Sequence, residues 1–325
     1  MTPLQRHINS RSLRQAARAA RIVLACRSLP APFTRWMQKR LWPASLRHMC
    51  AISEGFWFEL TAESAWVMRF GSREIARSVP FAKLIGSLDN RPVTIVASGP
   101  SARDFPWDNL RQQERFIIAV NGACGFLHDQ GILADLLVVT DAEFPRTGQA
   151  HLAKALEVPM VTTCAASSVY ASVSPNDLSR KKFAIIERVN AWYGIPALDL
   201  PSLADLNSRS GTPFHLSQGN PRKFKVGWSS NPELGFFSGC TVVFAALQVA
   251  IGLGANDIEI VGMDLGGVGR SYAEAEDAPP SLLESQYQDY ILPSFAIMNC
   301  ALTDTGISIR NHSTLCPLPH AFFVR

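Results

Sequence analysis

The sequence lacks several patterns that would place it at once in a known class of protein. Its seven cysteines are far apart and include no Cys-x-x-Cys pair, which argues against both a disulfide framework and a zinc site. No apolar run reaches the roughly 18 to 20 residues that span a bilayer, and the N-terminus lacks the apolar core and cleavage site of a signal peptide. We therefore expect a protein of the reducing cytoplasm that neither crosses a membrane nor is exported.

Acidic residues are absent from the first fifty positions, which hold ten Lys and Arg. The remaining residues carry 21 basic and 27 acidic side chains, so a cationic extension (residues 1–50) precedes a mildly acidic body. Ser12 to Arg27 has the apolar spacing of an amphipathic helix, and Phe33 to His48 mixes tryptophans with basic residues. These patterns predict that residues 1–48 bind an anionic membrane surface at the inner face of the inner membrane.

Three other interpretations of this extension stay open: a basic tail in solution, an arm that packs on the body, or a wrongly chosen start codon. No motif further along the chain supports RNA binding, so we expect no nucleic-acid partner.

The body has the pattern of an α/β protein. Residues 51–90 form a lead-in segment with one plausible strand, Phe56 to Leu60. From residue 91 to the end, short apolar runs alternate with helical stretches, which predicts a Rossmann-like, mostly parallel sheet with helices on both faces. Within this domain (91–325), residues 187–235 are rich in Pro, Gly, Ser and Asn and predict a loop-rich lid insertion. The predicted strands are Val93 to Ala97, Phe116 to Val120, Leu136 to Val139, Met160 to Thr163, Phe183 to Ile186, Ile258 to Val261 and Ile307 to Ile309, and the best helix is Ser238 to Leu253.

The first strand of that domain runs into the turn Ser98-Gly99-Pro100-Ser101. Gly99 permits a tight turn and a close backbone approach, and Ser101 can cap a helix whose free N–H groups face an anion. The turn therefore predicts a phosphate or nucleotide site, although the same pattern also occurs in plain connections. Neither a P-loop pattern nor a Gly-x-Gly-x-x-Gly turn after a strand is present.

The next two strands end in Asn121 and Asp141, and the carboxyl ends of parallel strands share one rim. Asn121 suits a base or a ribose hydroxyl, and Asp141 suits a hydroxyl or a metal. The alternatives are an asparagine in a left-handed turn and an aspartate that caps the following helix.

A later unit repeats this layout. Ser238 and Gly239 open the long helix, and Asp264 follows the next strand at the start of a Gly-rich loop. In that loop Arg270 could neutralise a phosphate and Tyr272 could donate a hydrogen bond to it, unless the loop is a simple surface connection.

Taken in order, these motifs resemble a known family. The segments Val-Ala-Ser-Gly-Pro-Ser (96–101), Val-Asn-Gly (120–122), Ser-Gly (238–239) and Gly-Met-Asp (262–264) resemble those of bacterial sialyltransferases that use CMP-activated sugars. They are also similar to lipopolysaccharide core proteins proposed to transfer Kdo, the related 3-deoxy-2-ulosonic acid. The resemblance covers roughly residues 91 to 315 and implies metal-independent, inverting transfer on a nucleotide-binding domain, without a cofactor.

By the same resemblance, Ser98, Gly99, Ser101 and Asn121 would lie at the CMP phosphate and ribose, and Asp141 near the sugar. Ser238, Gly239 and Asp264 would contact the donor, with Arg270 and Tyr272 at its phosphate. The sequence also departs from the family pattern. Ser98 replaces an Asn, Gly266 replaces a Tyr, and the catalytic His has no counterpart before the predicted helix Leu282 to Leu302, where Glu284, Gln286, Tyr287 and Asp289 stand instead.

That gap leaves the general base open among Asp141, Asp264 and His312. An inverting transfer needs a group that accepts the proton of the acceptor hydroxyl. His312 follows the last predicted strand and so shares the rim, and Arg310 beside it could pair with the carboxylate of the donor sugar.

The preferred hypothesis is a glycosyltransferase that moves Kdo, or less favourably sialic acid, from its CMP conjugate to a lipopolysaccharide or capsule acceptor. A second hypothesis is pyrophosphoryl transfer from ATP, as in the similarly arranged archaeal-type hydroxymethylpterin diphosphokinases, with Asp141 as a magnesium ligand. A third is a non-catalytic nucleotide fold that assembles with envelope enzymes.

Overall fold

The structure is a computed structural model that describes residues 40, 43–108, 114–210, 214–217, 225–265, 269–272 and 282–323. The amphipathic pattern at residues 12–27 and Gly266 lie outside the described residues. None of the helices within these ranges combines the length and the apolar character needed to cross a membrane.

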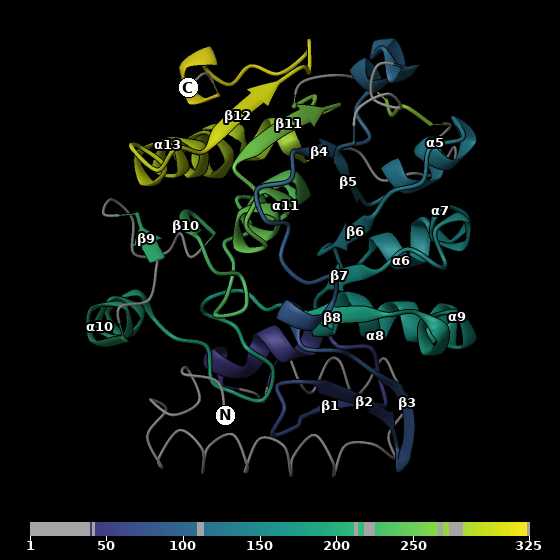
Figure 1. Cartoon of the computed structure of the whole chain (residues 1–325). Coiled ribbons are helices and arrows are strands. Elements are labelled where there is room, and N and C mark those ends of the chain that lie inside the picture. The colour runs from purple at the N-terminus through teal and green to yellow at the C-terminus, as the bar shows by residue number, and fades with distance from the viewer. Residues whose placement is uncertain are drawn as a thin grey trace.

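A seven-stranded sheet forms the centre of the molecule (Figure 1). All neighbouring strands are parallel, in the order β12-β11-β4-β5-β6-β7-β8. Every residue of β4, β5 and β6 is buried, as expected for strands covered on both faces. The α/β, Rossmann-like prediction is confirmed. The strands are β4 (Val93–Val96), β5 (Phe116–Val120), β6 (Leu136–Val139), β7 (Met160–Thr162), β8 (Phe183–Ile185), β11 (Asp257–Val261) and β12 (Ser308–Asn311).

Helices cover both faces of this sheet (Figure 1). One face carries α11 (Val242–Gly252) and α13 (Leu292–Ala301), and α13 follows directly on α12 (Leu283–Gln286) and a π-helical turn, Tyr287–Ile291. The helix α11 is apolar all round, which explains its burial on every side. The other face carries α5 (Ala123–Asp129), α6 (Phe144–Thr147), α7 (Gln149–Lys154), α8 (Cys164–Val173) and α9 (Pro175–Arg180).

The order of the strands creates a switch point. The chain lays down β4, moves in one direction through β5 to β8, and then returns to place β11 on the other side of β4. In open parallel sheets, ligands bind in the crevice that such a reversal opens at the carboxyl ends of the strands. Here that crevice lies between the turns after β4 and β11.

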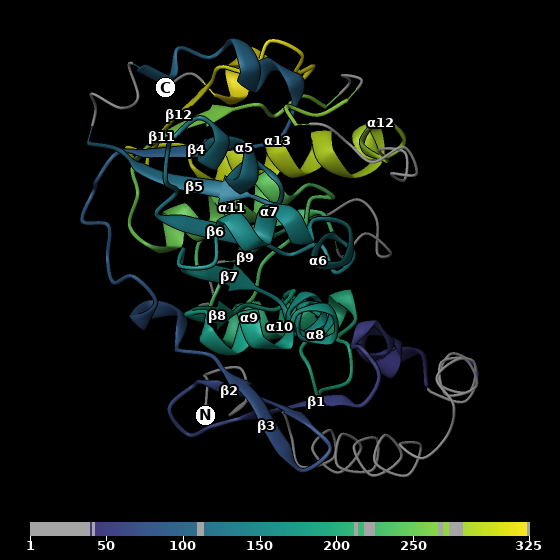
Figure 2. The same ribbon diagram turned by 90° about the vertical axis from the view of Figure 1, so that its right-hand side faces the viewer.

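The lead-in segment folds into an antiparallel sheet of its own, formed by β1 (Phe56–Leu60), β2 (Trp66–Phe70) and β3 (Arg73–Arg77). It lies beyond β8 (Figure 2), and the N–H of Val79 donates to the carbonyl of Phe183 at 2.8 Å. This small sheet therefore protects the edge strand β8 from open pairing. The sequence predicted β1, whereas β2 and β3 were missed.

Two segments differ from the sequence prediction, the end of the extension and residues 187–235. The 3-10 helix η2 (Ala44–Ala51) buries Leu46 and Met49 beside Tyr193, so the end of the predicted extension belongs to the folded body. The segment 187–235 is less loop-rich than predicted, because it contains α10 (Leu200–Ser210) and a hairpin of β9 (Phe214–Leu216) and β10 (Gly227–Ser229). Short 3-10 turns complete the described chain: η3 (Phe81–Lys83), η4 (Pro100–Asp104) and η6 (His320–Phe322).

Candidate functional site

A cavity of about 480 Å³ occupies the switch point. We call it the switch-point cavity; its wall comes mainly from residues 97–99, 120–121, 240–243 and 262–265. The structure thus brings together residues that are far apart in the sequence but share the carboxyl rim of the sheet. The sequence-predicted residues that line it are Ser98, Gly99, Asn121, Asp141, Asp264 and Arg270.

Asp264 joins the two turns at this switch point. It is buried, its Oδ2 accepts the N–H of Ser101 at 2.7 Å, and its Oδ1 accepts the Ser101 hydroxyl at 2.7 Å. The prediction that Ser101 caps a helix is wrong: η4 is a five-residue 3-10 turn without a side-chain cap, and the Ser101 donors go to Asp264. Hydrogen bonds to a charged acceptor are strong, so this contact fixes the shape of the Gly-Pro-Ser turn.

Gly99 is required where these turns meet. Its N–H donates to the carbonyl of Gly262 at 2.8 Å. A Cβ at Gly99 would lie 2.4 Å from that carbonyl oxygen and 2.4 Å from Asp264 Oδ2. The close backbone approach predicted for Gly99 is therefore present, and it is an approach to the neighbouring turn.

Asn121 has the clearest sign of an unfilled binding role. Its backbone is left-handed, with φ of 46°, so the left-handed turn weighed above is present. Its side-chain Oδ1 is also buried without a hydrogen-bond partner among the described residues. Buried acceptors of this kind are rare in folded proteins, and a ligand hydroxyl or amine in the cavity would satisfy this one.

The start of α11 forms a further wall of the cavity, through Thr241, Val242 and Val243. Thr241 makes no side-chain cap, so the positive end of the helix dipole faces this side. Gly239 is not in the wall, and its N–H donates to the carbonyl of Lys225 at 3.0 Å. Ser238 lines the second cavity described below. In this unit the switch-point cavity is thus lined by residues 240–243, which follow Ser238 and Gly239 in the sequence.

The loop after Asp264 is held in place by Arg103, which the sequence analysis missed. Its guanidinium donates to the carbonyls of Arg270 at 2.6 Å and Ser271 at 3.1 Å, while the N–H of Ser271 donates to the carbonyl of Ser98 at 2.8 Å. Arg103 follows the Gly-Pro-Ser turn in the sequence, but no pattern pairs it with a loop so distant along the chain.

Tyr272 lies beside this cavity without lining it. Its ring occupies the space where Gly122 would carry a Cβ, and it stacks on His151 with ring centres 4.1 Å apart. This position places it next to the Asn121 turn.

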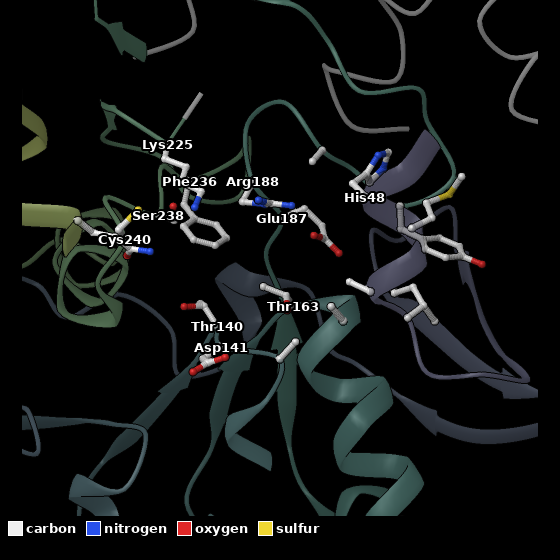
Figure 3. Close-up of a pocket in the computed structure, with 18 residues that line it drawn as sticks. His48, Thr140, Asp141, Thr163, Glu187, Arg188, Lys225, Phe236, Ser238 and Cys240 are labelled. Atoms are coloured by element: carbon white, nitrogen blue, oxygen red, sulfur yellow. The ribbon is translucent and has the colours of Figure 1, made fainter. Parts of the chain in front are cut away.

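A second cavity, of about 360 Å³, continues along the rim toward β8 (Figure 3). We call it the β8 cavity; its wall includes residues of η2, 140–142, 163, 187–188, 225, 236 and 238. Asp141, Cys240 and Gln286 line both cavities. The two spaces therefore meet and form one cleft along the carboxyl ends of β4 to β8 and β11.

Glu187 is the most perturbed acid of this cleft, and the sequence analysis missed it. It follows β8, is 8% exposed, and points its carboxylate into the β8 cavity (Figure 3). Its Oε1 accepts the N–H of Cys164, the first residue of α8, at 3.0 Å. Burial raises the pKa of Glu187 to about 7, against the lowering effect of the contact with Cys164 and the charge of Arg188.

Three basic side chains line the β8 cavity: His48, Arg188 and Lys225. His48 Nε2 lies 2.9 Å from the carbonyl of Trp192, its Nδ1 is buried without a partner among the described residues, and burial lowers its pKa. A neutral imidazole that donates from Nε2 leaves Nδ1 as an acceptor. The two remaining cations favour an anionic ligand.

The structure does not bring Arg310 and His312 to either cavity. Arg310 Nη2 lies 2.6 Å from Asp257 and 3.0 Å from Glu259, toward the amino end of β11. His312 packs on the ring of Phe105 and lies 3.8 Å from Glu259. The predicted pairing of Arg310 with a donor carboxylate is wrong, because that guanidinium already serves two acids beside the sheet. His312, proposed as a base, follows the carboxyl end of β12, where its N–H donates to the carbonyl of Ile260 at 2.8 Å.

Asp141 lies where the two cavities meet and is exposed. Its Oδ1 accepts the N–H of Glu143 at 3.0 Å, which closes a local turn before α6. The alternative that Asp141 caps the following helix is wrong, because α6 has Glu143 at its N-cap and no side-chain cap. Glu143 lines the switch-point cavity as well. Within the described ranges, no three His, Cys, Asp or Glu residues are grouped as metal ligands.

The fold is that of a Rossmann-like α/β protein with a cleft at its switch point. A family model described as "6-hydroxymethylpterin diphosphokinase MptE-like" matches residues 72–269, more than half of the chain. The chain belongs to this MptE-like family.

Two further proteins are similar to it. The probable 3-deoxy-manno-octulosonic acid transferase of Escherichia coli (strain K12) is 28% identical over 225 residues, which are 66% of this chain and 76% of that protein. The structure of the MAf glycosyltransferase from Magnetospirillum magneticum AMB-1 is 18% identical, covers 69% of this chain and gives a TM-score of 0.39. The match spans about a third of that protein, 32% of its length.

Proposed function

We propose that the chain is a glycosyltransferase that moves a 3-deoxy-2-ulosonic acid, Kdo in preference to sialic acid, from its CMP conjugate to a lipopolysaccharide or capsule saccharide. The observation that carries this proposal is the cleft formed by two joined cavities, one suited to a nucleotide phosphate and one to an anionic sugar. The similarity to a probable transferase of the same sugar class supports the choice of donor.

In this proposal the CMP moiety occupies the switch-point cavity. Its phosphate faces the start of α11 and Arg270, and its ribose meets Asn121. The carboxylate of the sugar faces Arg188 and Lys225 in the β8 cavity. The anomeric carbon then lies near Asp141, where the two cavities meet, and no cofactor takes part.

The direct test is incubation of the purified chain with CMP-Kdo generated in situ, or with CMP-sialic acid, and truncated core saccharides. We expect mass spectrometry to detect an acceptor heavier by one Kdo residue. If neither sugar is transferred to any core acceptor, the proposal is wrong.

A second function, pyrophosphoryl transfer from ATP, is favoured by the family model. Asp141 and Glu143 line the same cavity, and one or two carboxylates with substrate phosphates are the usual ligands of Mg²⁺. Thermal unfolding separates these possibilities, because a ligand stabilises the state that binds it. Stabilisation by CMP without metal supports the first function, magnesium-dependent stabilisation by ATP supports the second, and no response to either favours a non-catalytic role.

We also propose that the cationic extension attaches the protein to the cytoplasmic face of an anionic membrane. Because η2 is part of the folded body, the sharp test removes only residues 1–39. The full chain should sediment with vesicles that contain anionic lipid and should be released by salt. Equal sedimentation of the shortened chain would contradict this attachment.

A further inference from the structure

Glu187 has the position expected of a group that works on a substrate in the cleft. It follows the edge strand β8 of the parallel sheet, and the N-terminus of α8 anchors one of its oxygens through Cys164. The carboxylate is therefore held rigidly while it points into the β8 cavity (Figure 3). Fixed orientation of this kind is what proton transfer to a bound hydroxyl requires.

The groups around Glu187 come from every side of the cavity. Cys164 faces it from α8, Arg188 from its own strand end, and His48 from η2. Asp141, Tyr193, Lys225 and Cys240 complete the titratable groups of the wall. Burial opposes the ionised form of Glu187 and raises its pKa, whereas the contact with Cys164 and the charge of Arg188 favour that form.

We propose that Glu187 is the general base of the transfer reaction; this inference rests on the proposed function. The acceptor saccharide enters the β8 cavity and places one hydroxyl at the Glu187 carboxylate. As that oxygen forms a bond to the anomeric carbon, its proton passes to Glu187. The bond from the anomeric carbon to the phosphate oxygen breaks, and CMP leaves with its electron pair. Protonated Glu187 then returns the proton to solvent.

The other acids of the cleft fit this task less well. Both oxygens of Asp264 accept hydrogen bonds from Ser101. Asp141 is exposed, and one of its oxygens already accepts the N–H of Glu143. Burial moves the pKa of Glu187 to about 7, close to the value at which a base is most effective at neutral pH.

The test compares Glu187→Gln with Asp141→Asn, a matched change of carboxylate to amide at the junction of the two cavities. We measure kcat for transfer from CMP-Kdo between pH 5.5 and 8.5, and the dissociation constant for CMP. For the wild type, kcat should rise with pH with a midpoint near 7, because Glu187 must be ionised. Glu187→Gln should lower kcat by roughly 10²- to 10⁴-fold, with CMP affinity unchanged within about twofold. Asp141→Asn should keep the pH profile.

A third variant, Glu187→Asp, separates chemistry from folding. It retains a carboxylate and should recover at least about tenfold of the rate lost in Glu187→Gln, together with a pH-dependent profile. If Glu187→Gln keeps the wild-type rate and profile, the base assignment is wrong while the proposed function stands. If the wild type itself transfers no sugar, the proposed function fails before any variant is compared.

Discussion

The two halves of the cleft are built in different ways. The switch-point cavity depends on backbone shape: a glycine pressed against the opposite turn, a left-handed asparagine and the start of a buried helix. The β8 cavity depends on charged and titratable side chains, Glu187, Arg188, Lys225 and His48, delivered by segments with ordinary backbones. Local sequence motifs therefore indicate the switch-point cavity, where the chain must turn tightly. They do not indicate Glu187, the perturbed acid of the β8 cavity.

The largest expected effect, on stability and on CMP affinity, follows from a substitution at the switch-point cavity. Asp264→Ala removes both acceptors of Ser101. Hydrogen bonds to a charged group contribute about 1.5 to 3 kcal/mol each, so for two of them we expect a loss of about 3 to 6 kcal/mol in the free energy of unfolding, measured by urea denaturation. CMP affinity should fall at least about tenfold with the loss of turn geometry. The stability of Asp264→Asn, which keeps one acceptor, should lie between those of Asp264→Ala and the wild type. Equal stability of Asp264→Ala and wild type would show that the two turns need no hydrogen bond between them.

In the β8 cavity, by contrast, a substitution should raise the free energy of unfolding. Glu187→Gln keeps the acceptor for the Cys164 N–H but removes a buried acid. Because the folded pKa is about 7 against an ordinary value of 4.5, wild-type stability should fall as pH rises from about 4.5 to 7. At pH 8 the variant should be more stable by roughly 3 kcal/mol, at about 1.4 kcal/mol per pKa unit. Thermal unfolding at pH 4.5 and pH 8 measures this difference; a gain that is the same at both values would contradict a buried, titrating Glu187.

Gly99→Ala tests the contact between the two turns. The new Cβ would meet the carbonyl of Gly262 and Asp264, neither of which can move freely. We expect a loss of about 2 to 3 kcal/mol in stability, the usual effect of overpacking. The control is Gly86→Ala, where φ is 80° and no atom lies within 4 Å, so only the backbone cost of roughly 1 to 2 kcal/mol applies. A tolerated Gly99→Ala with unchanged CMP binding would mean that the turns can separate.

The smallest effect concerns Asn121. Asn121→Gly preserves the left-handed backbone and removes the unpartnered Oδ1. We expect stability close to wild type and CMP affinity about tenfold lower, which corresponds to about 1.4 kcal/mol. Asn90→Gly is the matched control, because Asn90 is exposed, also has a positive φ and lies outside both cavities. If titration calorimetry finds the same affinity for both variants, Asn121 does not contact the nucleotide.

Much of the fold could be predicted because five strands of the parallel sheet, β4 to β8, are buried at every residue. All seven strands of the parallel sheet follow from short apolar runs, and β5 and β6 have the predicted bounds. Strands β2 and β3 carry arginines on a partly exposed sheet, and this weakens the apolar pattern that marks a strand. Within 187–235, the Pro- and Gly-rich composition concealed α10 and the hairpin of β9 and β10.

The candidate site could be predicted only where local chemistry reveals it. Ser98, Gly99, Asn121 and Asp264 follow strands in turns that the sequence displays, and the structure gathers them at one rim. Glu187 stands in an unremarkable Glu-Arg pair, and its raised pKa arises from burial that only the folded sheet creates. Arg310 and His312 lie outside both cavities, and the sequence could not show this because their acidic neighbours are on the adjacent strand β11: Asp257 and Glu259 for Arg310, and Glu259 for His312.

The position of η2 limits how far the β8 cavity can lie from residue 39. Its His48 is part of the wall of the β8 cavity, and only nine positions separate it from residue 39, where the deletable part of the cationic extension ends. Even fully extended, nine residues span about 30 Å. If the end of the extension next to residue 39 contacts a lipid surface, this short span keeps the β8 cavity within about 30 Å of the headgroups, so that acceptors could be processed while still embedded.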